Sequence, residues 1–259
     1  MAKPISTSGT SADHLAVLDG WRGISILLVL AAHLLPLGPK SWKLNEMAGP
    51  MGMALFFTLS GFLITRFLLR DSGLLDFLSR RFFRIVPLAW MTLTLIVISF
   101  EVPTDFYFPN YLFYANLPPQ HLAEANAHFW SLCVEMQFYV GIAFAIKIFG
   151  KKTIFLVIPV CITVTLHRIY AGAEIDIVTW RRVDEILAGS ILALVYEGLL
   201  GSRIRSMISR ANPYFLIGIL VLASHPFGGP LNYIRPYVAA LLVGVTLLSP
   251  PPTLGDSLE

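Results

Sequence analysis

The sequence predicts an all-α protein, a polytopic transmembrane bundle of about eight spans, and three observations favour this class. Of the 259 residues, 56% are hydrophobic and only 14% are charged, whereas an average soluble domain carries about 25% charged residues. The mean hydropathy is +0.70. The apolar residues gather into long runs, and a transmembrane helix needs about 20 of them. This composition excludes a soluble enzyme, a disordered chain and a nucleic-acid binder.

Eight apolar runs along the chain are the predicted spans. They are Leu15–Leu37, Ala48–Leu69, Ile85–Phe100, Phe129–Phe149, Thr153–Tyr170, Val183–Leu200, Tyr214–Ala223 and Tyr233–Leu248. The third and seventh runs are short, so they need flanking aromatic residues or local thinning of the bilayer. Between the second and third runs, Leu74–Arg84 alternates apolar and basic residues. This segment is typical of an amphipathic interfacial helix that leads into the third span.

The remaining segments complete one integral membrane domain over residues 1–259. Because Met1–Ser11 is polar and small, we expect residues 1–14 to form a flexible N-terminus, and residues 250–259 to form a truncated or flexible end. Cys133 and Cys161 both lie inside apolar runs. This position is typical of small buried hydrophobic residues and not of a disulfide framework or a metal site, so no metal is predicted.

The distribution of Lys and Arg predicts the orientation in the membrane. Basic residues follow the second, fourth and sixth runs, whereas the long segment 101–128 has neither Lys nor Arg. The basic residues in question are Arg66, Arg70, Arg80, Arg81, Arg84, Lys147, Lys151, Lys152, Arg203, Arg205 and Arg210. Even-numbered spans should therefore end in the cytoplasm, which also places the N-terminus there. Lys40 and Lys43, in the first outer loop, are the weakest point of this prediction. The segment after the fifth run is mixed, since Arg168, Arg181 and Arg182 stand there beside Glu174, Asp176, Asp184 and Glu185.

Ionisable residues inside spans are costly and usually face a cavity or a partner, so they carry the functional signal. Arg22 and His33 lie eleven residues apart in the first run, which places them on one helical face, about 16 Å apart along the axis. Glu135 follows Phe129 by six residues in an antiparallel run. Topology alone therefore puts Glu135 at a depth similar to that of His33, where a carboxylate could raise the basicity of the imidazole and orient it as a general base.

A basic segment precedes the third run. Arg81 and Arg84 are spaced i and i+3, so they share a helical face and could bind phosphates bidentately on the cytoplasmic side. From the spacing alone, ordinary positive-inside charge with contacts to anionic lipid is the better explanation of these residues.

Five motifs follow one another along the chain: LDGWRGI at 18–24 with an arginine-to-histidine spacing up to His33, FFTLSGFLI at 56–64, RRFFRIVP at 80–87, WSLCVEMQFY at 130–139, and Arg182 with Glu185 and Gly189. In this order they resemble the motifs of the acyltransferase 3 family of integral membrane O-acyltransferases. Each motif is weak alone, but the ordered set, covering about residues 15–195, is specific. Family members commonly have about ten spans, so the resemblance also implies a fragment or a short divergent member.

The resemblance implies transfer of an acyl group, often acetyl, from cytoplasmic acyl-CoA to a hydroxyl of a glycan or another exported or lipid-linked acceptor of the cell envelope. On this basis we expect His33 and Glu135 to be catalytic. Arg22, Arg81 and Arg84 are expected to hold the CoA phosphates, with no metal involved. The acceptor would lie near Arg182, Glu185, Ser60 and Trp130. The expected location is a bacterial inner membrane. The sequence does not identify the acceptor, the acyl chain or the oligomeric state.

A second function class uses the same residues differently. In a transporter or flippase, Arg22, His33 and Glu135 would form a proton or substrate pathway. That class favours inverted repeats with interrupted helices, and the sequence shows no such internal symmetry. Within the enzyme class, His33 could act either as a general base or as a nucleophile that carries the acyl group.

Overall fold

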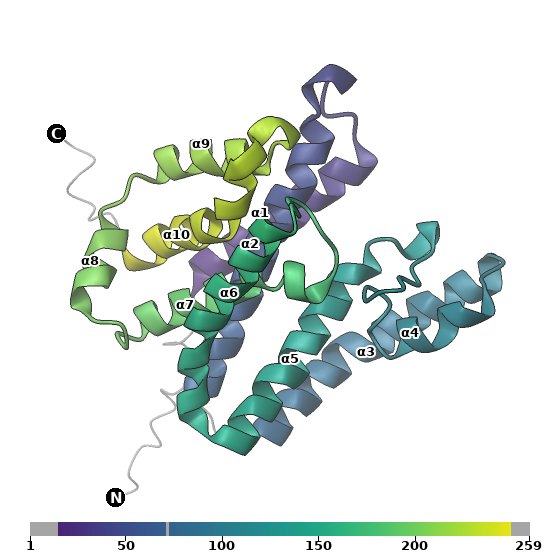
Figure 1. Cartoon of the computed structure of the whole chain (residues 1–259), viewed down its shortest axis with the longest axis horizontal. Coiled ribbons are helices and arrows are strands. Elements are labelled where there is room, and N and C mark those ends of the chain that lie inside the picture. Colours follow the sequence, from purple (N-terminus) through teal and green to yellow (C-terminus); the bar gives the residue numbers. More distant parts are fainter. Residues whose placement is uncertain (1–14, 71–72, 250–259) are drawn as a thin grey trace, which may run out of the picture.

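The computed structural model describes residues 15–70 and 73–249, and within them it contains helices and no strand. The expectations for residues 1–14 and 250–259 lie outside this range. The α-helices are α1 (Ala16–Leu34), α2 (Leu44–Arg70), α3 (Leu74–Ser99), α4 (Tyr107–Tyr111), α5 (Phe129–Phe149), α6 (Val157–Tyr170), α7 (Asp184–Tyr196), α8 (Ser202–Ser209), α9 (Pro213–Ser224) and α10 (Arg235–Leu248). The all-α polytopic class predicted from the composition is confirmed (Figure 1).

The helix α2 is the centre of the bundle. It packs most extensively against α1 on one side and α7 on the other, and it also contacts α10. Glycines permit the α2–α7 crossing, since a Cβ atom on Gly61 would lie 1.8 Å from the carbonyl oxygen of Ile186. Reciprocally, a Cβ on Gly189 would lie 2.0 Å from the carbonyl oxygen of Thr58. Small residues of this kind let helix backbones approach closely inside a membrane.

Within residues 15–70 and 73–249, six helical segments are long and apolar enough to cross a membrane, and a seventh arises if the bent pair α8–α9 is counted as one span. Two of the eight predicted spans therefore differ from the structure. The predicted span Val183–Leu200 contains α7, whose 13 residues rise only about 20 Å, less than the hydrocarbon thickness of about 30 Å. The predicted span Tyr214–Ala223 falls in α9, which joins α8 at an angle of 85°.

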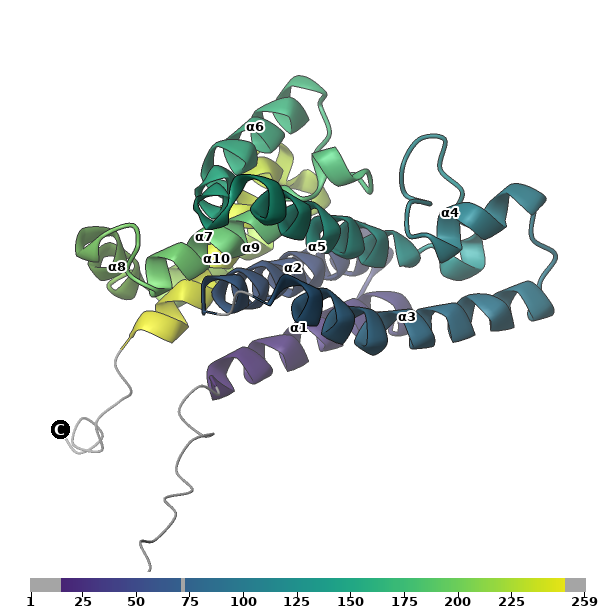
Figure 2. The same cartoon turned by 90° about the horizontal axis from the view of Figure 1, so that it is seen from below.

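The third span is longer than predicted. The helix α3 runs without interruption through Leu74–Ser99 and includes Pro87, so the predicted interfacial helix and the following span are one element. A proline removes one backbone donor, but a helix inside a bilayer still needs its other hydrogen bonds and often continues past it. In Figures 1 and 2, α3 and α4 extend away from the rest of the bundle, on the side where α5 begins.

The connection between α3 and α5 is folded rather than open. Buried asparagines fix it: Asn110 accepts a hydrogen bond from Asn126, and Asn116 donates to the hydroxyl of Thr179 at 2.8 Å. Gln137 of α5 donates to Asn116 and accepts from Thr179. These amides join the connection to α5 and to the segment before α7. Cys133 and Cys161 are free and buried, as predicted.

Candidate active site

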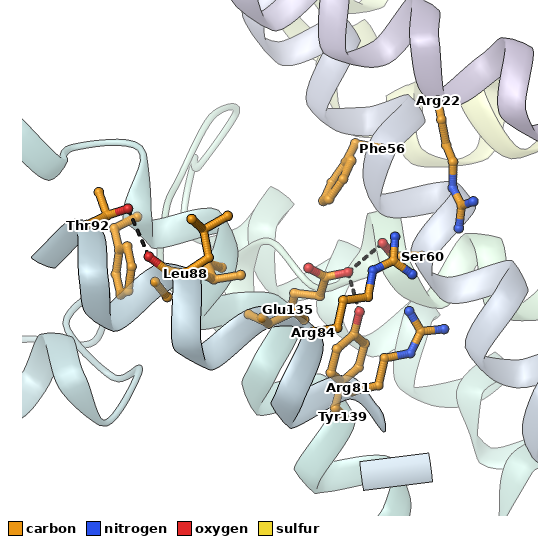
Figure 3. Close-up of a pocket in the computed structure, with 13 residues that line it drawn as sticks. Arg22, Phe56, Ser60, Arg81, Arg84, Leu88, Thr92, Glu135 and Tyr139 are labelled. Carbon is orange, nitrogen blue, oxygen red and sulfur yellow. Dashed lines mark hydrogen bonds between the residues drawn. The ribbon is translucent and has the colours of Figure 1, made fainter. Parts of the chain in front are cut away.

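A cavity of about 400 Å³ opens between α1, α2, α3 and α5 (Figure 3). Four of the predicted site residues that are charged line it together, although they come from three different helices: Arg22, Arg81, Arg84 and Glu135. Ser60 of α2 and Tyr139 of α5 lie beside Glu135. The other lining residues are Phe56, Ile85, Leu88, Ala89, Thr92, Phe129 and Leu132. The cavity is therefore polar at one end and apolar around the rest of its wall.

The carboxylate of Glu135 is held through one oxygen. Ser60 Oγ donates a hydrogen bond to Glu135 Oε1 at 2.6 Å, and the hydroxyl of Tyr139 donates to the same oxygen. In Figure 3 the second oxygen of Glu135 points away from both hydroxyls. Glu135 is only 6% exposed, and a buried carboxylate needs such partners because water does not solvate it fully.

Three guanidinium groups give the cavity a positive balance. Arg81 and Arg84 project from one face of α3, as their spacing predicts, and Arg22 approaches from α1 (Figure 3). Against these three positive charges the lining holds one negative charge, that of Glu135, so its balance is +2. Arg81 and Arg84 also line a second cavity of about 210 Å³, whose wall includes Phe67 and Phe77. Such a site suits an anionic ligand with a bidentate group, such as a phosphate.

His33 is not among the residues that line this cavity. It lies in the last turn of α1, where its Nδ1 is 2.7 Å from the carbonyl oxygen of Val29. Because a carbonyl oxygen only accepts, Nδ1 carries the proton, and in the neutral ring Nε2 keeps a free lone pair. The ring also meets that of His128 edge-on, with centroids 4.1 Å apart.

The predicted pairing of His33 with Glu135 is not among the contacts of the described residues. Glu135 contacts Ser60 and Tyr139, whereas His33 contacts Val29 and His128. His128 directly precedes α5 and Glu135 follows it by seven residues, which corresponds to about 10 Å along the helix. Glu135 therefore lies deeper than His33, at the level of the arginines. Both depths were estimated from the sequence by counting residues from the ends of two antiparallel runs, and this count is too coarse to show the difference in depth between His33 and Glu135.

Three of the residues expected near the acceptor lie elsewhere. Arg182 and Glu185 are 1% and 0% exposed and form an ion pair at 3.4 Å. Glu185 also accepts a hydrogen bond from Arg235 of α10 at 3.0 Å. Trp130 packs beneath Arg182, with the guanidinium 5.2 Å from the ring centroid. Of the four predicted acceptor residues, only Ser60 lines the cavity.

Arg182 and Glu185 belong to a buried charge cluster that joins α6, α7 and α10. Its other members are Arg168, Asp184 and Arg235, of which Arg168 and Asp184 form a second ion pair. Several of the cluster's atoms have no hydrogen-bond partner among the residues that the structure describes, including Arg182 Nη1 and Arg235 Nη2. Removing one partner from a buried ion pair leaves an uncompensated charge, so the loss of any one member of the cluster should destabilise this packing.

Sequence reasoning missed two neighbours of the predicted site. Tyr139 lies one helical turn after Glu135, and this i,i+4 spacing is a signal that places it on the same face. His128 adjoins His33, but only the fold of the preceding connection brings them together. Burial and the neighbouring His33 lower the pKa of His128 below its ordinary value, which favours a neutral ring.

Comparisons with known proteins point to one family. A family model described as an acyltransferase domain matches residues 15–252. The chain is 27% identical to O-acetyltransferase OatA of Staphylococcus aureus, over 72% of this chain and 35% of that protein. It is 28% identical to peptidoglycan O-acetyltransferase OatA of Listeria monocytogenes, over 52% of this chain and 24% of that protein. The chain thus spans about a third or less of these relatives. No solved structure matches it.

Proposed function

The chain belongs to the acyltransferase 3 family, and from this premise we propose that it transfers an acetyl group from cytoplasmic acetyl-CoA to a hydroxyl of a cell-envelope glycan. The observation that carries the donor assignment is the +2 balance of the cavity formed by Arg22, Arg81, Arg84 and Glu135. Acetyl-CoA is a thioester whose CoA part carries several phosphate groups, and planar guanidinium groups bind phosphates bidentately.

The donor lies along α1 in this proposal. Its phosphates contact Arg22, Arg81 and Arg84, and the pantetheine arm extends past Glu135 toward His33. The distance along α1 from Arg22 to His33 is about 16 Å, which is of the same order as the length of that arm. The bilayer is then crossed by the acyl group and not by CoA.

His33 is the general base of the proposed reaction. Its Nε2 takes the proton of the acceptor hydroxyl while that oxygen attacks the thioester carbon. The carbon–sulfur bond breaks, and the CoA thiolate leaves and receives the proton. The carbonyl oxygen of Val29 holds the tautomer that this step needs. Glu135 is the second catalytic group of the proposal: it lines the same cavity as the three arginines, and its free oxygen points away from the hydroxyls of Ser60 and Tyr139 (Figure 3).

The acceptor approaches from the opposite side of the membrane. The connection of residues 101–128 has neither Lys nor Arg, and it lies beside the end of α1 that carries His33, through the contact of His33 with His128. Peptidoglycan is the first acceptor to test, because one relative is named for it. The proposed setting is a bacterial inner membrane with the N-terminus in the cytoplasm.

Transfer by the purified chain in liposomes tests the proposal. Acetyl-CoA labelled on its acetyl group is supplied on one side and peptidoglycan fragments on the other. We expect label on the glycan and one free CoA thiol for each acetyl group transferred. A transporter or flippase would instead move label across the bilayer without releasing the thiol, and that result would contradict the proposal.

A further inference from the structure

Two hydroxyl groups from different helices converge on one oxygen of Glu135. Ser60 reaches it from α2, and Tyr139 reaches it from the next turn of α5. A carboxylate has two oxygens and can accept several hydrogen bonds at each. Here both bonds go to Oε1, and within the described residues Oε2 has no hydrogen-bond partner although it borders the cavity (Figure 3).

Both donors are themselves held in place. Tyr139 is 2% exposed, with the ring of Phe77 edge-on at 5.9 Å and the guanidinium of Arg81 at 5.6 Å from its centroid. Ser60 precedes Gly61, where α2 and α7 approach so closely that a Cβ atom would overlap a backbone oxygen of Ile186. A tyrosine hydroxyl follows its ring rigidly, so Tyr139 cannot follow Glu135 if the carboxylate rotates, and the close crossing at Gly61 fixes the backbone that carries Ser60.

We propose that Ser60 and Tyr139 are positioning residues that lock Glu135 by Oε1 so that Oε2 faces the reactants. This inference rests on the proposed function, in which Glu135 is catalytic. It assigns Ser60 to the carboxylate and not to direct contact with the acceptor. The partner of Oε2 is an O–H or N–H donor, either the acceptor hydroxyl or an amide of the pantetheine arm, since a carboxylate oxygen only accepts.

Arg81 contacts both the donor site and Tyr139, one of the two residues that hold Glu135. Its guanidinium lines the cavity and lies over the ring of Tyr139, whose hydroxyl holds Glu135. Replacing Tyr139 by Phe keeps the ring under Arg81 and removes only the hydroxyl. Donor binding and the orientation of the carboxylate can therefore be separated in one variant.

The experiment measures kcat, both KM values and CoA affinity for Tyr139→Phe, Ser60→Ala and Ser60→Thr, with and without Glu135→Gln. We expect Tyr139→Phe and Ser60→Ala each to lower kcat about tenfold, the scale of one lost hydrogen bond to a charged group. CoA affinity should stay within about twofold. Ser60→Thr should recover most of the rate because it keeps a hydroxyl. A higher KM for the acceptor or for the donor identifies the group that meets Oε2.

A double-mutant cycle distinguishes positioning from a general structural effect. If the hydroxyls act through Glu135, adding Tyr139→Phe to Glu135→Gln should lower kcat by less than twofold further. Tyr111→Phe is the matched control, since it loses a tyrosine hydroxyl that contacts Thr94 outside the cavity, and it should keep the full rate.

Two failures can be told apart. If Glu135→Gln lowers kcat but Tyr139→Phe does not, or if their effects multiply in full, the positioning assignment is wrong while the proposed function stands. If the unaltered chain transfers no acetyl group, or if Glu135→Gln keeps the full rate, the catalytic role of Glu135 fails and this inference fails with it.

Discussion

At His33, a backbone carbonyl orients the imidazole ring, the role that the sequence analysis expected of the Glu135 carboxylate. The hydrogen bond from Nδ1 to Val29 holds the ring within its own helix, so no second span has to supply the orienting group. A neutral carbonyl fixes the tautomer but adds no negative charge beside the ring. His33 therefore owes its position to α1, and Glu135 owes its position to Ser60 and Tyr139.

We predict that His33→Ala lowers acyl transfer by about 10²–10⁴-fold, the range for loss of a general base, while acetyl-CoA still binds. Glu135→Gln should have a comparable or milder effect, since it keeps one acceptor oxygen. The measurement is the transfer rate beside CoA affinity in liposomes. His167→Ala, on the exposed side of α6, is the control. A His33→Ala protein with nearly unaltered transfer would leave a structural histidine in place of the proposed base.

His128 allows a prediction about pH and stability. Burial and His33 lower its pKa, so the unfolded chain takes up a proton more readily than the folded chain. The stabilisation is then present above the ordinary histidine value of about 6.5 and is lost as pH falls below it. Between pH 7.5 and 5.5, the Tm of the unaltered protein should fall more than that of His128→Gln, by on the order of 1–2 °C. Equal losses in both proteins would contradict this.

At the scale of single helices, α3 places its two arginines by periodicity alone. Arg81 and Arg84 line the same cavity because they stand at i and i+3 on one helix. This pair could be predicted from the sequence, and so could the bounds of α5, which match the predicted run Phe129–Phe149. Both follow from local spacing.

Other elements could not be predicted in this way, because their structure depends on contacts between segments that are far apart in the sequence. The run Val183–Leu200 is apolar enough for a span, but α7 ends at Tyr196, and the backbone has a positive φ at Gly198 and Gly201. Its buried charges Asp184 and Glu185 find their partners, Arg168 and Arg235, on two other helices. For the same reason the sequence did not pair His33 with His128, since their meeting depends on how the α3–α5 connection folds.

We predict that the arginines of the donor site do not tolerate lysine. Arg81→Lys and Arg84→Lys should each weaken CoA binding about tenfold, because a point charge does not replace a planar fork. Titrating each variant with CoA and with dephospho-CoA checks this and shows which phosphate each side chain contacts. Arg210→Lys, on the far side of the bundle after α8, should bind as the unaltered chain does. If the affinity for CoA is unchanged in both cavity variants, these arginines do not hold the donor and serve only as positive charge on the cytoplasmic side.

The α2–α7 crossing gives a stability prediction. Gly61→Ala and Gly189→Ala should each destabilise the protein by about 1–3 kcal/mol or more, since the added methyl group meets backbone that cannot move aside. Gly218→Ala in α9 meets open space and should be neutral or stabilising by up to about 1 kcal/mol. Thermal unfolding in detergent compares the three variants. A destabilised Gly218→Ala protein with tolerant crossing variants would show that the crossing is looser than described.

On the scale of the whole molecule, contacts between distant segments define two ends. At one end, His225 contacts the carbonyl oxygen of Trp42 at 3.0 Å, and His33 meets His128. At the opposite end, Glu197 pairs with Arg66 and Arg70. Arg81 and Arg84 of the cavity lie in the first half of α3, and α3 begins at this second end, where α2 finishes. The fold therefore separates a strongly basic end from an end that carries the histidine pair.

The prediction of the orientation in the membrane follows from this separation of the two ends. Basic residues favour the cytoplasmic side, so we expect Lys151 inside and Glu124 outside. Single cysteines at these two positions, in a background with Cys133→Ala and Cys161→Ala, can be treated with a membrane-impermeant maleimide on intact cells. Glu124→Cys should react at once, and Lys151→Cys should react only after the membrane is opened. Labelling of Lys151→Cys from outside would show that the orientation in the membrane is opposite to the predicted one. The arginine cavity would then face away from cytoplasmic acetyl-CoA, and the proposed direction of transfer would be wrong even if every distance in the site were right.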